Sequence, residues 1–212
     1  MNKQKTIYHL VVDKSGSMSD CIDNTIMGFN EQVSKIIGMQ REFPDQEISM
    51  GLTTFNTEVH QHLLNADPRR VEPLTRNTYR PEGGTALLDA IGSTILSLKS
   101  ELAVCSLRIP TTVVVVILTD GHENSSREFS LGMIREMIST LEATGQWTFS
   151  FIGATLDTAE VAESMAIKRE NSYSFSKNEM KEEVWDKLSS SMRCYFHQKT
   201  KGINNDNKLF EN

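Results

Sequence analysis

The sequence of 212 residues has few cysteines, few prolines and no long apolar run. Its three cysteines, Cys21, Cys105 and Cys194, are odd in number and far apart. They can therefore form neither a disulfide framework nor a Cys-x-x-Cys zinc site. All three fall in segments predicted to be helical, where cysteine usually acts as a small buried hydrophobe. This usage favours a reducing compartment.

The chain also lacks an excess of basic residues and any segment that resembles a membrane span. Its formal net charge is −6, which argues against a general nucleic-acid-binding protein, since those normally present a basic face. The apolar run near the N-terminus has only six residues, includes His9 and ends at Asp13. A signal peptide needs about 7–15 apolar residues and a membrane span about 20. We expect a cytoplasmic protein without nucleic-acid or membrane partners.

Two hydrophobic patterns alternate along the chain. Apolar residues spaced by three and four predict helices, and short β-branched or alternating runs predict strands. Strands are predicted over 7–12, 48–55, 58–63, 113–118, 147–154 and 171–175. Helices are predicted over 19–39, from 85 to a point before Pro110, and over 130–144, 158–166 and 179–197, with a short one near 69–74.

This alternation predicts a doubly wound α/β fold with helices on both faces of a mostly parallel sheet. The polar strand 58–63 follows 48–55 after a tight turn, so it should be an antiparallel strand at the sheet edge. One domain is expected over residues 1–197. Residues 198–212 are polar, with four asparagines after position 198, and we expect a tail that is disordered or becomes ordered on binding.

Oxygen-bearing side chains gather where the predicted strands end. The first strand stops at Asp13, with Ser15 and Ser17 in the turn that follows, and the most apolar strand stops just before Asp120. Thr85 follows a pair of glycines in a third loop. Ligands bind at the carboxyl ends of strands in open α/β sheets, and short oxygen donors suit Mg²⁺. Taken alone, the first loop is also a good helix cap.

Three segments together resemble a known family. Residues 13–18 (Asp-Lys-Ser-Gly-Ser-Met), 83–90 (Gly-Gly-Thr-Ala-Leu-Leu-Asp-Ala) and 118–121 (Leu-Thr-Asp-Gly) are similar in order and spacing to the metal-ion-dependent adhesion site of the von Willebrand factor type A domain. The resemblance covers about residues 5–197 and is strongest with bacterial intracellular members. It implies a Rossmann-like fold and a metal site made of Asp13, Ser15, Ser17, Thr85 and Asp120, each acting directly or through water.

The resemblance also implies a function. The expected ion is Mg²⁺, with Mn²⁺ or Ca²⁺ as alternatives, and its open position would take a Glu or Asp from a partner protein. A site of this kind favours binding over catalysis, so we expect no enzyme. Two alternatives remain: a scaffolding domain whose metal only braces the loops, and a Mg²⁺-dependent phosphohydrolase. The phosphohydrolase is disfavoured because Ser15 stands where such enzymes generally carry a second acid.

Residues near these motifs allow more than one interpretation. Asp89 lies one helical turn after Thr85 and could support the metal site or be an exposed acid. His60 and His62 share one strand face and could bind zinc, although a polar edge strand is favoured. His122, Glu123 and Asn124 follow the second aspartate and could contact a partner.

Overall fold

The computed structural model describes residues 3–105, 109–154, 157–175, 183–202 and 208–210. Its strands are β1 (Gln4–Asp13), β2 (Gln46–Phe55), β3 (Val59–Ala66), β4 (Thr111–Thr119), β5 (Trp147–Gly153) and β6 (Ser172–Ser174). Its α-helices are α1 (Ile22–Glu42), α2 (Leu87–Cys105), α3 (Leu131–Glu142), α4 (Thr158–Ser164) and α5 (Glu183–Thr200). Short 3-10 helices cover Gly16–Cys21, Pro68–Arg70 and Arg169–Asn171.

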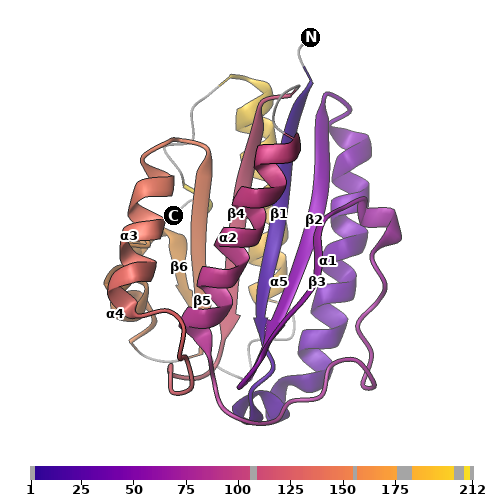
Figure 1. Ribbon diagram of the computed structural model, residues 1–212. Coiled ribbons are helices and arrows are strands. Elements are labelled where there is room, and N and C mark those ends of the chain that lie inside the picture. The colour runs from indigo at the N-terminus through magenta and orange to yellow at the C-terminus, as the bar shows by residue number, and fades with distance from the viewer. Residues whose placement is uncertain (1–2, 106–108, 155–156, 176–182, 203–207, 211–212) are drawn as a thin grey trace.

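The six strands form one sheet in the order β3-β2-β1-β4-β5-β6, with helices on both sides (Figure 1). β1 pairs in parallel with β2 and β4, β4 with β5, and β5 with β6. Only β3 runs antiparallel, against β2, at the edge of the sheet. The predicted doubly wound fold and its antiparallel edge strand are confirmed.

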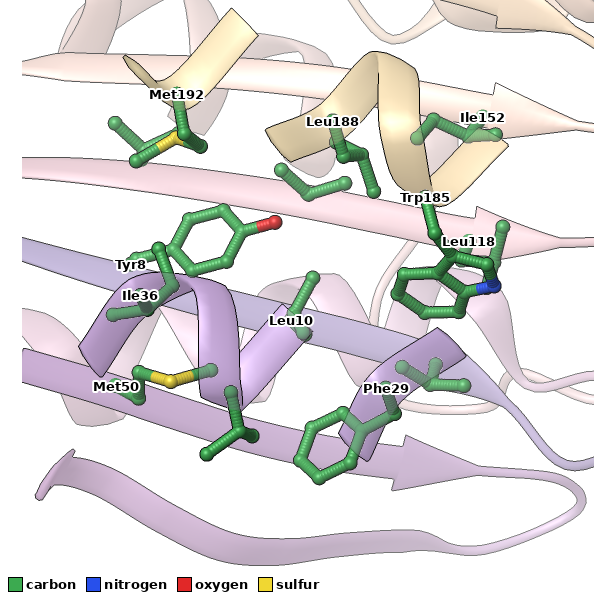
Figure 2. Packing of buried hydrophobic residues seen from close by; sticks show 14 of the residues in the cluster. Tyr8, Leu10, Phe29, Ile36, Met50, Leu118, Ile152, Trp185, Leu188 and Met192 are labelled. Carbon is green, nitrogen blue, oxygen red and sulfur yellow. The ribbon is translucent and has the colours of Figure 1, made fainter. Parts of the chain in front are cut away.

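The central strands are apolar on both sides because each side of the sheet has its own hydrophobic core. Tyr8 and Leu10 of β1 pack with α1 and α5, whereas Ile7 and Val11 pack with α2 and α3. Figure 2 shows part of the first core, to which Leu10 contributes from β1 alongside residues of α1 and α5. The β-branched run of β4 alternates between the two cores in the same way, as expected for a parallel strand covered on both faces.

α1 and α5 approach each other closely at one glycine. A methyl group added to Gly28 of α1 would lie 1.9 Å from Nε1 of Trp185 on α5, so only glycine fits beneath the indole. The same helices are also joined by hydrogen bonds, from Ser189 Oγ to Gln32 Oε1 (2.6 Å) and from Lys35 Nζ to Asp186 Oδ1 (2.6 Å). The helix contact is therefore set by both shape and polar pairing.

A glutamine side chain covers the part of β2 that β3 leaves unpaired. The pairing of β3 with β2 ends at Ala66 opposite Met50. Beyond that point, Gln40 of α1 donates from Nε2 to the Gln46 carbonyl (2.5 Å) and accepts from the Ile48 N–H at Oε1 (2.8 Å). The amide of Gln40 therefore supplies one donor and one acceptor to the strand, as a neighbouring strand would.

The structure corrects the helix predicted near residues 69–74. Only Pro68–Arg70 is helical, as a single 3-10 turn that the Asp67 side chain caps at the Arg69 N–H. Asn30 of α1 then binds the backbone of Leu74 through both the N–H (2.8 Å) and the carbonyl (2.9 Å). These two bonds fix the backbone of Leu74 directly to α1, outside any helix.

The C-terminal segment also differs from the expectation. α5 continues past residue 197 to Thr200, and Leu209 and Phe210 are buried. The Leu209 N–H donates to Asn171 Oδ1 (2.8 Å), and the ring of Phe210 lies 6.2 Å from that of Tyr173 in β6. Residues 208–210 are ordered, because the apolar pair Leu209 and Phe210 completes the core beside β6. The rest of the predicted tail beyond residue 202, and the start of the helix predicted at 179, lie outside the described residues.

No helix among the described residues is long and apolar enough to cross a membrane.

Candidate metal centre

The predicted site lies at the carboxyl ends of β1 and β4, the two neighbouring central strands. The chain leaves β1 toward α1 on one face of the sheet and leaves β4 toward α3 on the other face. The strand order reverses here, and the loops diverge to leave a crevice, which is where ligands bind in doubly wound folds. The topology therefore places Asp13 and Asp120 beside each other.

Hydrogen bonds connect the first loop to the end of β4. Asp13 Oδ1 accepts from the Ser15 N–H (2.6 Å), and Asp13 Oδ2 accepts from the Thr119 hydroxyl (2.6 Å). The hydroxyls of Ser15 and Ser17 lie 3.0 Å apart, and that of Ser17 donates to Asp120 Oδ1 (2.5 Å). Four of the five predicted residues thus form one continuous network.

Thr85 reaches the same point from the third loop. A methyl group added to Gly121 would lie 3.2 Å from Ser17 Oγ, 3.3 Å from Thr85 Oγ1 and 3.9 Å from Asp13 Oδ2. Oxygens from the first loop and from the loop of Thr85 therefore lie around the backbone that directly follows Asp120. The structure brings together all five residues that the sequence singled out.

The two buried carboxylates of this cluster would attract a cation. Asp13 is fully buried and Asp120 is 7% exposed. Burial raises the pKa of the Asp13 carboxyl and the negative charge of Asp120 adds to this, while hydrogen bonds from Thr119 and Ser15 lower it. Two nearby buried carboxylates repel each other, and a divalent ion between them would remove that repulsion. Such an ion would be held by the five residues named above.

The donor chemistry fits a hard divalent cation. The cluster offers two carboxylates and three hydroxyls, with neither sulfur nor imidazole, and hard ions such as Mg²⁺ prefer oxygen. Ser17 is exposed, whereas Asp13, Ser15 and Thr85 are buried. The cluster therefore opens to solvent on the Ser17 side, where a further ligand can approach.

The sequence prediction missed two residues that hold Asp13 in place. The Tyr79 hydroxyl donates to the backbone carbonyl of Asp13 (2.6 Å), and Thr119 holds the carboxylate of the same residue. Thr119 adjoins Asp120 in the sequence, so its position was a usable signal. Tyr79 lies in a proline-containing connection without periodicity, and only the folded chain shows its role.

Comparison with known proteins identifies the family. The model of the von Willebrand factor type A domain matches residues 9–189, which is most of the chain. The chain belongs to this family. Such vWA domains often bind metal through a metal-ion-dependent adhesion site and mediate protein interactions. A search of the curated proteins finds no match.

Solved structures share the fold of this vWA domain at low sequence identity. Proximal thread matrix protein 1 from the mussel byssus, with a zinc-occupied MIDAS motif, is 19% identical with a TM-score of 0.55, over 92% of this chain and 45% of that chain. The ArnB paralog VWA2 from Sulfolobus acidocaldarius is 14% identical with a TM-score of 0.59, over 90% and 46%. Manganese-loaded Plasmodium vivax TRAP protein is 19% identical with a TM-score of 0.58, over 84% and 70%. This chain spans less than half the length of the first two.

Asp89, Glu123 and Asn124 of the vWA domain bind backbone groups of the loops that carry the cluster. Asp89 accepts from backbone N–H groups of residues 127–129. Glu123 accepts from the Leu88 N–H in the first turn of α2, and Asn124 accepts from the Thr85 N–H just before that helix. The three bonds to residues 127–129 show that Asp89 is not a freely exposed acid. The carboxylate of Glu123 is likewise engaged inside the domain.

His60, His62 and His122 have other neighbours. His62 Nε2 is 2.8 Å from the Thr54 hydroxyl, and His60 Nε2 is 3.8 Å from a carboxylate oxygen of Glu58. Within the described ranges, no three His, Cys, Asp or Glu side chains form a cluster that could hold a metal. The zinc interpretation of His60 and His62 therefore has no support. His122 is exposed, with Nδ1 3.9 Å from Asp157 Oδ2.

Proposed function

We propose that this vWA domain is a protein-interaction module that binds a divalent cation, Mg²⁺ by preference, and uses it to bind a carboxylate of a partner protein. The single observation that carries the proposal is the convergence of the oxygens of Asp13, Ser15, Ser17, Thr85 and Asp120 at the solvent-facing end of β1 and β4. The zinc-occupied MIDAS motif of one solved structure with this fold supports a metal at this place, and a second structure with this fold is manganese-loaded.

The charge of the site favours a carboxylate ligand. Two carboxylates only balance the charge of a divalent ion, and the three hydroxyls are neutral donors. A side-chain carboxylate of a partner would be attracted to the ion, more strongly where the interface excludes water. The residues of this chain would orient the ion, keep its inner side dry and leave the Ser17 side open. Mn²⁺ and Ca²⁺ are the alternative ions.

We propose no catalytic role for the site. The hydrogen bonds of the cluster join serine, threonine, aspartate and tyrosine groups, and Ser15 stands where a phosphohydrolase generally carries a second acid. A phosphohydrolase would need a group that stabilises the transferred phosphoryl. A panel of phosphate esters should therefore show no Mg²⁺-dependent turnover, and turnover that disappears in Asp13→Asn would overturn this part of the proposal.

Metal binding can be measured directly with Mn²⁺ as a probe. Electron paramagnetic resonance reports free Mn²⁺, and competition with Mg²⁺ then gives its affinity. Asp13→Asn and Asp120→Asn should abolish saturable binding. Glu82→Gln is the matched control, because it removes an exposed charge from a neighbouring loop. Absence of a saturable site in the wild-type protein, or equal binding by all four proteins, would refute the metal site.

Carboxylate recognition needs a separate test. Random peptides displayed on phage can be selected on the immobilised domain in Mg²⁺ and eluted with EDTA. We expect the recovered sequences to share one Glu or Asp. Replacing that residue by Gln or Asn should abolish binding. Peptides that bind equally in EDTA, or that tolerate this replacement, would contradict metal-mediated recognition.

The second candidate is a domain whose metal only braces the loops. It is favoured by the burial of Asp13, Ser15, Thr85 and Asp120, which would bury most of an ion's surroundings. In that case EDTA should lower the melting temperature while partner binding stays unchanged. A loss of partner binding on chelation, in a domain that remains folded, separates the first candidate from the second.

A further inference from the structure

The start of α2 is capped by residues of a distant loop. The helix begins at Leu87, after Ala86, whose methyl side chain cannot accept a hydrogen bond. The Leu88 N–H instead donates to Glu123 Oε2 (2.9 Å), and the Asp89 N–H donates to Ser126 Oγ (3.0 Å). The loop between β4 and α3 thus satisfies backbone groups that a local capping residue normally would.

The capping is reciprocal, because α2 returns a carboxylate to the same loop. Asp89 Oδ2 accepts from the Arg127 N–H (2.8 Å), and Oδ1 accepts from the N–H groups of Glu128 (2.9 Å) and Phe129 (2.8 Å). Glu123 Oε1 meanwhile accepts from the N–H groups of residues 125 (2.9 Å) and 126 (2.7 Å). Each carboxylate accepts several backbone bonds, and bonds to an ionised acceptor are the strong ones.

This double clamp, made by the carboxylates of Asp89 and Glu123, adjoins two parts of the candidate metal centre. Thr85 lies two positions before the first residue of α2. Its backbone carbonyl accepts from the N–H groups of Asn124 (3.1 Å) and Ser125 (3.3 Å). The Thr85 N–H donates to Asn124 Oδ1 (2.8 Å). Glu123 follows Asp120 in the same loop by three positions. Fixing this loop on the start of α2 therefore fixes the Thr85 hydroxyl relative to the Asp120 carboxylate.

We propose that Asp89 and Glu123 are positioning residues of the metal site, which hold Thr85 and Asp120 at the separation that the ion requires. The inference rests on the proposed function, since it assigns these acids to the geometry of that site. Neither carboxylate is a metal ligand in this scheme, because both are committed to backbone N–H groups. In other metal sites, mutating a residue that orients the metal ligands through hydrogen bonds typically lowers metal affinity about 10- to 100-fold.

The variants Asp89→Asn and Glu123→Gln test the clamp. Each keeps the size of the side chain but replaces one acceptor oxygen by an N–H₂ group that faces backbone donors. The Mn²⁺ dissociation constant, measured well below the melting temperature of each variant, should rise about 10- to 100-fold. Glu128→Gln is the matched control: it removes the same charge from the same loop, at an exposed side chain, and should change the constant by no more than about twofold.

A milder variant keeps the test decisive if either clamp variant fails to fold. Ser126→Ala removes the acceptor of the Asp89 N–H and should weaken Mn²⁺ binding about fivefold. Folded clamp variants, or a folded Ser126→Ala, with wild-type affinity would overturn the positioning role even if they melt earlier. An equal loss in Glu128→Gln would also overturn it, because the effect would then be charge alone. If the wild-type protein itself has no saturable site, the proposed function fails rather than the clamp.

Discussion

Acid should destabilise this domain through one buried histidine. His9 lies in the centre of β1 with no exposed surface, and its Nε2 is 2.9 Å from the Thr53 hydroxyl, which in turn accepts from Thr94 of α2 (3.1 Å). The ring also lies against Gly51, where an added methyl group would lie 2.0 Å from Nδ1. The surroundings of the ring thus offer hydroxyl groups and backbone, and burial lowers its pKa from 6.5 to about 3.

The direction and size of the effect follow from proton linkage. Below pH 6.5 the unfolded chain protonates this histidine, while the folded chain keeps it neutral until about pH 3. The free energy of unfolding therefore falls as pH decreases through this window, by about 1.4 kcal/mol for each pH unit. Between pH 7 and pH 5 the loss should be about 2 kcal/mol, or about 4–8 °C in melting temperature for a chain of this length.

Urea unfolding followed by far-ultraviolet circular dichroism at pH 7 and pH 5 measures this loss. The reference protein is His9→Gln, which keeps a hydrogen-bonding side chain of similar length but does not titrate. Other groups, including His62, titrate in both proteins and cancel in the comparison. The wild-type protein should lose about 2 kcal/mol more than the variant between these pH values. A difference below about 0.5 kcal/mol would falsify the reasoning, because His9 could not then be held neutral.

Three further predictions concern packing, the metal loop and the ion. Gly28→Ala should lower the free energy of unfolding by about 1–3 kcal/mol, because the added methyl group collides with Trp185. Gly38→Ala in the same helix should raise the free energy of unfolding by about 0.5–1 kcal/mol, because nothing lies within 4 Å of its added methyl group. Urea unfolding distinguishes them, and equal effects would contradict the predicted collision. Tyr79→Phe should cost about 0.5–1.5 kcal/mol and weaken Mn²⁺ binding, since it removes the hydrogen bond to Asp13; unchanged affinity would show that the first loop holds its shape alone. Mg²⁺ at 100 times its dissociation constant should add about 2.7 kcal/mol of stability that EDTA removes, and a melting curve insensitive to both would argue against an ion at the site.

The sheet and the residues of the candidate site were predictable because their signals are local. The apolar run that ends at Asp13 and the β-branched run that ends before Asp120 each mark a buried strand and its carboxyl end. Parallel neighbours end at one edge, so the two acids had to meet if the strands were adjacent. Thr85 carries a weaker signal, and only its place in the family motif connected it with the other residues.

The contacts that hold the site were not predictable, because they join segments far apart in the sequence without any periodicity. Asp89 and residues 127–129 are 38–40 positions apart, and Tyr79 is 66 positions from Asp13. An aspartate in the first turn of a helix is ordinary, so nothing local distinguished Asp89. Leu209 and Phe210 form an isolated apolar pair in a polar segment. Their burial is explained only by the apolar side chains beside β6 that they cover in the folded chain.

The amide of Gln40 has a consequence for the association of this domain with copies of itself. An open strand edge is a template on which another chain can add a strand, and proteins that leave one exposed risk aggregation. At β2 the carbonyl of Gln46 and the N–H of Ile48 are already bonded to this side chain. An incoming strand would have to displace the glutamine before it gained either bond. One residue of α1 thus protects the sheet from templated growth at the place where β3 is too short to cover it.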